Sequence, residues 1–127
     1  IIKDRLTEKI KRVVLSGISL GASIATIAAV ELAGSVDQKI QLVIFSPYCT
    51  GDREYNKYAT KILDASWSLK NINDVIASAF YNRIGHTILF DYYGCDRTSN
   101  HCEIIDMLEV MDDKEKLEDK TFYFSDG

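Results

Sequence analysis

One serine of this chain stands in a pattern that exposes a nucleophile. Ser19 is the centre of the segment G-I-S-L-G at residues 17–21, which matches the pattern G-x-S-x-G. A β-branched run at residues 13–15 precedes it, and an apolar stretch without a breaker follows from residue 20 to residue 33. The context therefore predicts a strand, a sharp turn that carries Ser19, and a helix. Such a turn presents a hydroxyl that can attack an ester carbonyl.

The glycines of this segment have a physical purpose. A serine on so sharp a turn has strained backbone geometry, and side chains at positions 17 and 21 are expected to collide with the adjacent strand and helix. The turn also points the positive end of the following helix at the serine oxygen, where the backbone N–H of Leu20 can donate to an oxyanion. We therefore expect Ser19 to be the nucleophile and Leu20 an oxyanion donor. The alternative is a plain glycine-rich turn between a strand and a helix.

The rest of the chain alternates between strand and helix patterns. Strands are predicted at residues 13–15, 39–45, 66–69 and 84–93, and helices at residues 20–33, 52–63 and 101–111. Residues 3–11 have helical spacing and are expected to end an amphipathic surface helix. Strands that alternate with helices imply a parallel sheet covered on both faces. The sequence therefore predicts an α/β fold in one domain.

Composition limits the classes of function. The 127 residues are 46% hydrophobic and 27% charged, as in a soluble globular protein. A net charge of -4 argues against a nucleic acid as the main partner. Cys49, Cys95 and Cys102 form no metal-binding pattern, so no metal site is expected. Their odd number fits a reducing compartment, and a bridge between Cys95 and Cys102 is the alternative in a secreted protein.

The start of the chain has a second interpretation. Basic residues at 9–12 and the apolar run that ends at residue 33 have the outline of a secretory signal peptide. Polar residues interrupt the run, among them Ser16, Ser23 and Glu31, and this favours a strand, a turn and a helix instead. The run is also shorter than the ~20 apolar residues that a bilayer requires. Because a helix-like pattern is already under way at Ile1, we expect the chain to be part of a longer domain.

Around Ser19 the sequence resembles the class 3 lipase family, whose turn usually reads G-H-S-L-G-G before small residues. Residues 16–25 (SGISLGASIA) match it, with Ile18 in place of the histidine and Ala22 in place of the last glycine. The resemblance continues in F-S-P at 45–47 and G-D at 51–52, and runs from about residue 12 to residue 111. It implies a parallel-sheet α/β-hydrolase, of which residues 1–127 are expected to be the C-terminal part, without the first strands.

The resemblance also implies a catalytic triad in the chain order serine, aspartate, histidine. Residues 71–75 (NINDV) look like the segment that bears the acid, with Ile76 where a proline commonly follows. Asp74 would then orient an imidazole and stabilise its cation. The alternative is that Asp74 only caps a turn.

Two histidines are candidates for the general base. The active site of a parallel sheet forms at the carboxyl ends of its strands. His86 lies at the start of the strand predicted at 84–93, whereas His101 follows that strand. We therefore expect His101 to be the base, and the segment after Asn100 resembles the family's histidine at the opening of a late helix. The alternative is a capping or surface histidine.

The expected activity is hydrolysis of carboxylic esters, in particular lipid acyl esters, through an acyl-enzyme. No cofactor is needed. The expected partners are a small acyl ester or lipid substrate and a transient contact with a lipid surface. Two alternatives remain: a catalytically silent, lipase-like interaction protein, which Ile18 in place of histidine favours, and another hydrolase of the same fold, such as a thioesterase or a peptidase.

Overall fold

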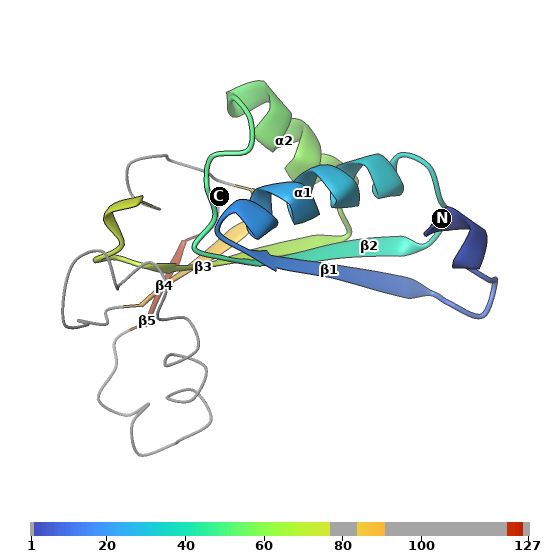
Figure 1. The fold of residues 1–127 in the computed structure, drawn as a ribbon, viewed down its shortest axis with the longest axis horizontal. Coiled ribbons are helices and arrows are strands. Elements are labelled where there is room, and N and C mark those ends of the chain that lie inside the picture. Colours follow the sequence, from blue (N-terminus) through green and yellow to red (C-terminus); the bar gives the residue numbers. More distant parts are fainter. Residues whose placement is uncertain (1, 77–83, 91–121, 126–127) are drawn as a thin grey trace, which may run out of the picture.

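The computed structural model describes residues 2–76, 84–90 and 122–125 (Figure 1). In chain order the elements are η1 (Lys3–Arg5), β1 (Arg12–Ile18), α1 (Leu20–Ala33), β2 (Lys39–Phe45), α2 (Arg53–Ile62), β3 (Ala65–Asn71), β4 (His86–Phe90) and β5 (Phe122–Ser125). The strands form one five-stranded sheet in the order β1-β2-β3-β4-β5. This arrangement confirms the predicted α/β fold.

Strands β1 to β4 are parallel, and β5 pairs with β4 in the antiparallel direction. The register aligns Ile18 with Phe45 and Phe45 with Leu69, so that β1, β2 and β3 end at the same edge of the sheet. Backbone hydrogen bonds continue this alignment past the ends of the strands, from Ser19 N to Phe45 O and from Ser46 N to Leu69 O. The residues that follow the strands are therefore gathered at one edge, as the sequence predicts for a parallel sheet.

Helices α1 and α2 lie on the same face of the sheet (Figure 1). The core between the sheet and the helices contains alternate residues of β2, namely Ile40, Leu42 and Ile44, each at most 2% exposed. Helix α1 contributes Ala22, Ala25 and Ala29 to it. The small alanine side chains bring the helix backbone close to the strands, and a run of good helix formers without glycine or proline explains why the helix is continuous.

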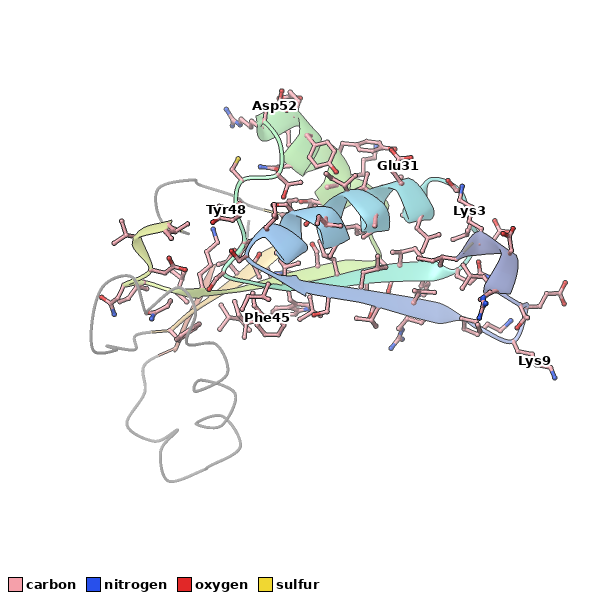
Figure 2. All side chains as sticks on the ribbon, viewed as in Figure 1. Lys3, Lys9, Glu31, Phe45, Tyr48 and Asp52 are labelled. Carbon is pink, nitrogen blue, oxygen red and sulfur yellow. The ribbon has the colours of Figure 1, made fainter. Side chains whose placement is uncertain are left out.

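The other face of the sheet carries apolar residues that the described helices do not cover. Leu69 and Phe90 are buried there, and Phe45 packs against them on the face away from the helices (Figure 2). Among the described strands, β1 has β2 alone as a neighbour, and Val14 and Ile18 are 55% and 40% exposed. Helix α1 exposes Leu20, Ile24 and Ile27 in the same way. The expectation of a sheet covered on both faces is thus met on one face in the described part of the chain.

The predicted elements agree with the structure where the hydrophobic pattern extends over many residues. The helix at 20–33 and the strand at 39–45 have the predicted bounds, and the helix predicted at 52–63 is α2 with Asp52 as its N-cap. Strands β1 and β3 extend beyond the predicted 13–15 and 66–69. The strand predicted at 84–93 is β4, although residues 91–93 lie outside the described residues, as does the helix predicted at 101–111.

The helix predicted at 3–11 is wrong. The structure has a single 3-10 turn, η1, in which the N–H groups of Arg5 and Leu6 donate to Ile2 and Lys3. Of this segment Leu6 packs against the core, which is too little to stabilise a short helix in water. Within the described ranges, no helix is long and apolar enough to cross a bilayer.

Candidate active site

Ser19 lies between β1 and α1, on a turn with strained backbone. Its φ is 53° and its ψ is -122°, a region that residues with a side chain rarely occupy. Such a conformation costs on the order of 1–3 kcal/mol and persists only where the surrounding structure imposes it. The surrounding structure does so here, because Ser19 N donates to Phe45 O at 3.0 Å and Ser19 O accepts from Ala22 N at 3.0 Å. The turn holds Ser19 in place from both sides.

The glycine before the serine is required by the turn. A Cβ built on Gly17 would lie 2.2 Å from Gly21 O and 2.8 Å from Ala22 N, and both of these atoms belong to backbone. The second glycine differs, because a Cβ on Gly21 would have no atom within 4 Å. The expected collision is therefore confirmed at position 17 and wrong at position 21, where the direction of the Cβ leads into open space.

The first turn of α1 follows the serine directly. The hydroxyl of Ser19 makes no capping hydrogen bond to the helix, so it is not used to close the helix N-terminus. The first N–H groups of an α-helix lack partners within the helix and carry its positive partial charge. Leu20 is the first residue of α1, and its side chain is 66% exposed. If the backbone N–H of Leu20 is to donate to an oxyanion, a helix must begin beside the serine, and α1 begins there.

Asp74 lies in a turn at the end of β3 and is 0% exposed. Its N–H donates to Asn71 O at 3.1 Å, and its Oδ1 accepts from Ile76 N at 2.9 Å. Asn71 Oδ1 accepts from Asn73 N at 3.1 Å in the same turn. The turn thus fixes a carboxylate, which has lost its contact with water, next to the edge where the strands end.

Ser19 and Asp74 therefore follow β1 and β3 at the same edge of the sheet, with β2 between them. Two spacings between neighbouring strands correspond to roughly 10 Å. This is the separation between strands β1 and β3, the two strands that precede Ser19 and Asp74.

His86 is the first residue of β4 and lies away from this edge. It pairs in register with Trp67, on which its ring stacks with the ring centroids 4.6 Å apart. Three strand spacings, roughly 14 Å, separate β4 from β1. His86 also lies two residues before Ile88, which shares the row of Leu69 and Phe45. His101 lies outside the described residues.

A second strained residue borders the serine. Ser46 follows β2, is 2% exposed and has a φ of 42°. Its N–H donates to Leu69 O at 2.8 Å, and the preceding carbonyl, Phe45 O, accepts from Ser19. The sequence indicated only that the strand ends at residue 45 and that F-S-P at 45–47 resembles the family. The strain at Ser46 was missed, because serine before proline is common in ordinary loops.

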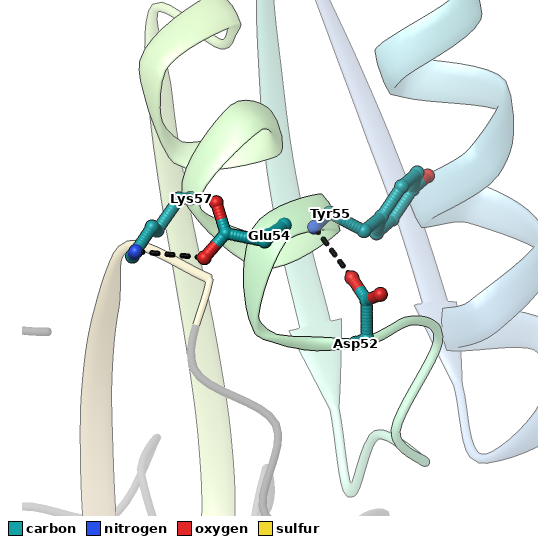
Figure 3. A network of polar contacts seen from close by, with 4 residues as sticks. All are labelled: Asp52, Glu54, Tyr55 and Lys57. Carbon is teal, nitrogen blue, oxygen red and sulfur yellow. Dashed lines mark hydrogen bonds and ion pairs between the residues drawn. The ribbon is translucent and has the colours of Figure 1, made fainter.

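The loop after β2 ends at the N-terminus of α2 (Figure 3). Asp52 Oδ1 accepts from Tyr55 N at 2.8 Å, and Lys57 forms an ion pair with Glu54 at 2.8 Å. Burial, and then the negative charge of Glu31, raises the pKa of Tyr55 above its ordinary value. These contacts anchor α2 and its loop, and Tyr55 stays neutral at physiological pH.

The described residues contain no group of three or more His, Cys, Asp or Glu side chains that could hold a metal ion. Cys49 is exposed and its thiol is free, while Cys95 and Cys102 lie outside the described residues. A shallow hollow at the amino ends of the strands is lined by Glu8, Ile10, Lys11, Asp37 and Gln38. It lies at the end of the sheet opposite to Ser19 and takes no part in the candidate site.

A nucleophile-type turn on a parallel sheet, with a buried carboxylate after a later strand, is the arrangement of an α/β-hydrolase. Residues 2–83 match the family described as lipase (class 3). This match covers more than half of the chain, which therefore belongs to the class 3 lipase family of lipase-like hydrolases. It includes Ser19 and Asp74, whereas His101 lies beyond it. No curated protein and no solved structure matches the chain.

Proposed function

We propose that this protein hydrolyses carboxylic esters, in particular lipid acyl esters, with Ser19 as the nucleophile. The observation that carries the proposal is the backbone of Ser19, whose φ of 53° is enforced by Gly17 and by hydrogen bonds on both sides. Strain of this kind at a non-glycine residue is typical of functional sites. Membership of the class 3 lipase family supports an ester or lipid substrate.

In the proposed reaction His101 removes the proton of the Ser19 hydroxyl as its oxygen attacks the ester carbonyl. The N–H of Leu20 stabilises the negative charge on the carbonyl oxygen, together with the positive end of α1. His101 then gives the proton to the departing alcohol, which leaves an acyl group on Ser19. Water repeats the same steps and releases the acid. Asp74 orients the imidazole and stabilises its cation.

We further propose that residues 1–127 are the C-terminal part of one α/β-hydrolase domain. Among the described residues no strand pairs with the second edge of β1, and this supports the proposal, because a parallel strand with apolar residues on both faces is normally an inner strand. Val14 on one face of β1 and Ile24 on the outer side of α1 are 55% and 62% exposed, as expected for residues that further elements cover.

The experiment is hydrolysis of p-nitrophenyl esters of increasing acyl length by the full-length protein. Ser19→Ala, Asp74→Asn and His101→Ala are each expected to lower kcat by about 10⁴-fold or more, as loss of triad members does in serine hydrolases. Ser23→Ala and His86→Ala are the matched controls and should stay within about twofold of the wild type, since both changes lie outside the proposed triad.

Loss of activity in His86→Ala with full activity in His101→Ala would exchange the base and retain the hydrolase. Full activity of Ser19→Ala would refute the proposal. A wild-type protein with no hydrolysis of any acyl length would favour the silent, lipase-like alternative, for which Ile18 in place of histidine is the sequence argument. A strong preference for thioesters of the same acyl chain would assign the chemistry to a thioesterase.

A further inference from the structure

One peptide group connects β1 to β3 beside Ser19. Its carbonyl, Phe45 O, accepts from Ser19 N at 3.0 Å. Its N–H belongs to Ser46 and donates to Leu69 O at 2.8 Å. Phe45 is paired with Ile18 on one side and with Leu69 on the other, so this peptide group lies where the three strands end. The backbone nitrogen of the candidate nucleophile is thus bound to a group that is itself held from the opposite side.

The chain leaves this peptide group through a strained residue. Ser46 has a φ of 42° and is 2% exposed, and the side chain of Pro47 after it is fully buried. A residue before proline normally has a negative φ and an extended backbone. Of the described residues other than glycine, Ser46 and Ser19 are the two with positive φ, and each directly follows the last paired residue of its strand. Strain of this kind persists where the surrounding structure imposes it.

The two strained residues are linked through the peptide group between Phe45 and Ser46. The φ of Ser46 is the rotation about the bond from its nitrogen to its Cα, so it sets how this rigid peptide group is oriented relative to the chain that follows. Because Pro47 is buried, a residue that does not keep a positive φ at position 46 is expected to turn the peptide group in preference to moving the proline. Such a turn moves Phe45 O away from Ser19 N and removes one of the two hydrogen bonds that hold Ser19.

We propose that Ser46 is a positioning residue, whose positive φ orients the peptide group between Phe45 and Ser46 so that it holds Ser19 in its strained conformation. This inference rests on the proposed function, since that assigns the nucleophile to Ser19. Ser46 acts through its backbone, and the role involves no contact of its hydroxyl with the substrate or the reacting atoms. Position 46 should therefore accept residues by their tolerance of a positive φ, not by their polarity.

Two substitutions separate the backbone of Ser46 from its hydroxyl. Ser46→Gly removes the hydroxyl, but glycine adopts a positive φ as readily as a negative one, so the full-length variant should retain kcat on a p-nitrophenyl ester within about threefold. Ser46→Thr keeps the hydroxyl, but a β-branched residue rarely adopts a positive φ. Ser46→Thr should lower kcat by about 10-fold to 100-fold with KM within about twofold, because a shift of about 1 Å in a catalytic group costs about 100-fold.

The matched control is Ser68→Thr, which adds the same methyl group to a serine of β3 that is 1% exposed. Ser68 lies inside a regular strand, whose backbone a β-branched residue favours. Overpacking lowers the stability of both threonine variants, whereas loss of the positive φ at position 46 should lower kcat of the folded protein. Ser68→Thr should thus keep kcat within about twofold of the wild type.

Amide hydrogen exchange followed by NMR tests the link without any activity. In Ser46→Thr the Ser19 N–H should exchange about 10-fold or more faster than in the wild type, since the hydrogen bond that holds it is lost. The Asp64 N–H donates to Ile40 O near the start of β2 and is the internal reference for a general loss of stability. In Ser46→Gly and Ser68→Thr the ratio of the two exchange rates should stay close to that of the wild type.

Urea unfolding covers the case in which Ser46→Thr does not fold. Ser46→Gly should unfold at a higher urea concentration than Ser46→Ala, since both lack the hydroxyl and glycine alone relieves the strain. Equal stability of these two variants would mean that position 46 is not strained, and the inference would fall.

The kinetic and exchange results can each overturn the inference. Full kcat in Ser46→Thr with a loss in Ser46→Gly would assign the role to the hydroxyl. Wild-type kcat and exchange in both variants, or equal losses in Ser46→Thr and Ser68→Thr, would leave no role for the positive φ. If the wild type hydrolyses no ester, the proposed function fails, and the exchange of the Ser19 N–H still decides whether Ser46 holds Ser19.

Discussion

The tightest contact of the candidate site predicts the effect of one methyl group. In Gly17→Ala the new Cβ would lie 2.2 Å from Gly21 O, 2.5 Å from Gly21 C and 2.8 Å from Ala22 N. Ordinary contacts of a Cβ begin at 3.4 Å, so the first turn of α1 must move away from β1 by about 1.2 Å, the difference between 3.4 and 2.2 Å. A change of side-chain rotamer cannot relieve the overlap, because all three atoms belong to the backbone.

This displacement has two measurable consequences. Overpacking of this kind typically costs about 1–3 kcal/mol, and the contact with rigid backbone places Gly17→Ala at the upper end of that range. A shift of about 1 Å in a catalytic group can lower the rate by about 100-fold. We therefore expect Gly17→Ala to unfold at a lower temperature than the wild type and to lose about 100-fold or more in kcat on a p-nitrophenyl ester.

Gly21→Ala is the matched control, since it adds the same methyl group to the same turn. A Cβ at this position has no atom within 4 Å, and alanine is favoured over glycine in a helix by about 1 kcal/mol. Gly21→Ala is thus expected to be at least as stable as the wild type and to retain its activity. Equal losses in the two variants, or a fully active Gly17→Ala, would refute the account of the turn.

Three further predictions follow from local geometry. Ser19→Gly should be more stable than Ser19→Ala by about 1 kcal/mol in urea unfolding. Glycine relieves about 1–3 kcal/mol of backbone strain at this position, but it costs about 0.5–1 kcal/mol because the unfolded chain has more conformational freedom. Equal stability of the two variants would mean that the turn is not strained. Asp52→Ala should cost about 1 kcal/mol by removing the N-cap of α2, whereas Asp52→Asn should cost less, and equal losses would assign no role to the cap. The pKa of Asp64 is below its ordinary value because Gln41 and then Lys39 donate to its carboxylate. The ionised carboxylate therefore stabilises the folded protein above the pKa that Asp64 has in the unfolded chain, and this contribution is lost as the pH falls through the pKa of the folded protein. Gln41→Leu should raise the pKa of Asp64 in an NMR titration, and an unchanged value would contradict the stated cause.

The elements that sequence could predict are those with a long and regular hydrophobic pattern. The 14 residues of α1 are apolar or small almost throughout, and five of the seven residues of β2 are apolar before the strand ends at Ser46-Pro47. The segment at 3–11 has helical spacing as well, but burial decides whether a short helix forms, and spacing alone does not report burial. Strand β5 was not predicted, because four residues are too few for a periodic signal.

Some features of the candidate site could be predicted from the sequence, and others could not. The position of Ser19 follows from G-x-S-x-G between a strand and a helix, and the placement of Asp74 after β3 follows from the order of the elements. The strain at Ser46 could not be predicted, since it depends on how neighbouring strands align. The different roles of Gly17 and Gly21 were also hidden, because they depend on the direction in which each Cβ would point. Residue type reports the chemistry that is available, and the register of the sheet decides where it lies.

The central claim is that Ser19 is an activated nucleophile, and covalent labelling tests it most directly. The full-length protein is treated with a fluorophosphonate, which reacts with the serine of an assembled serine-hydrolase site, and the modified peptide is located by mass spectrometry. We predict one phosphonyl group per chain on the peptide that contains Ser19, with labelling lost in Ser19→Ala and retained in Ser23→Ala. Labelling of Ser19→Ala to the same extent as the wild type, or no labelling of the folded wild-type protein, would contradict the account.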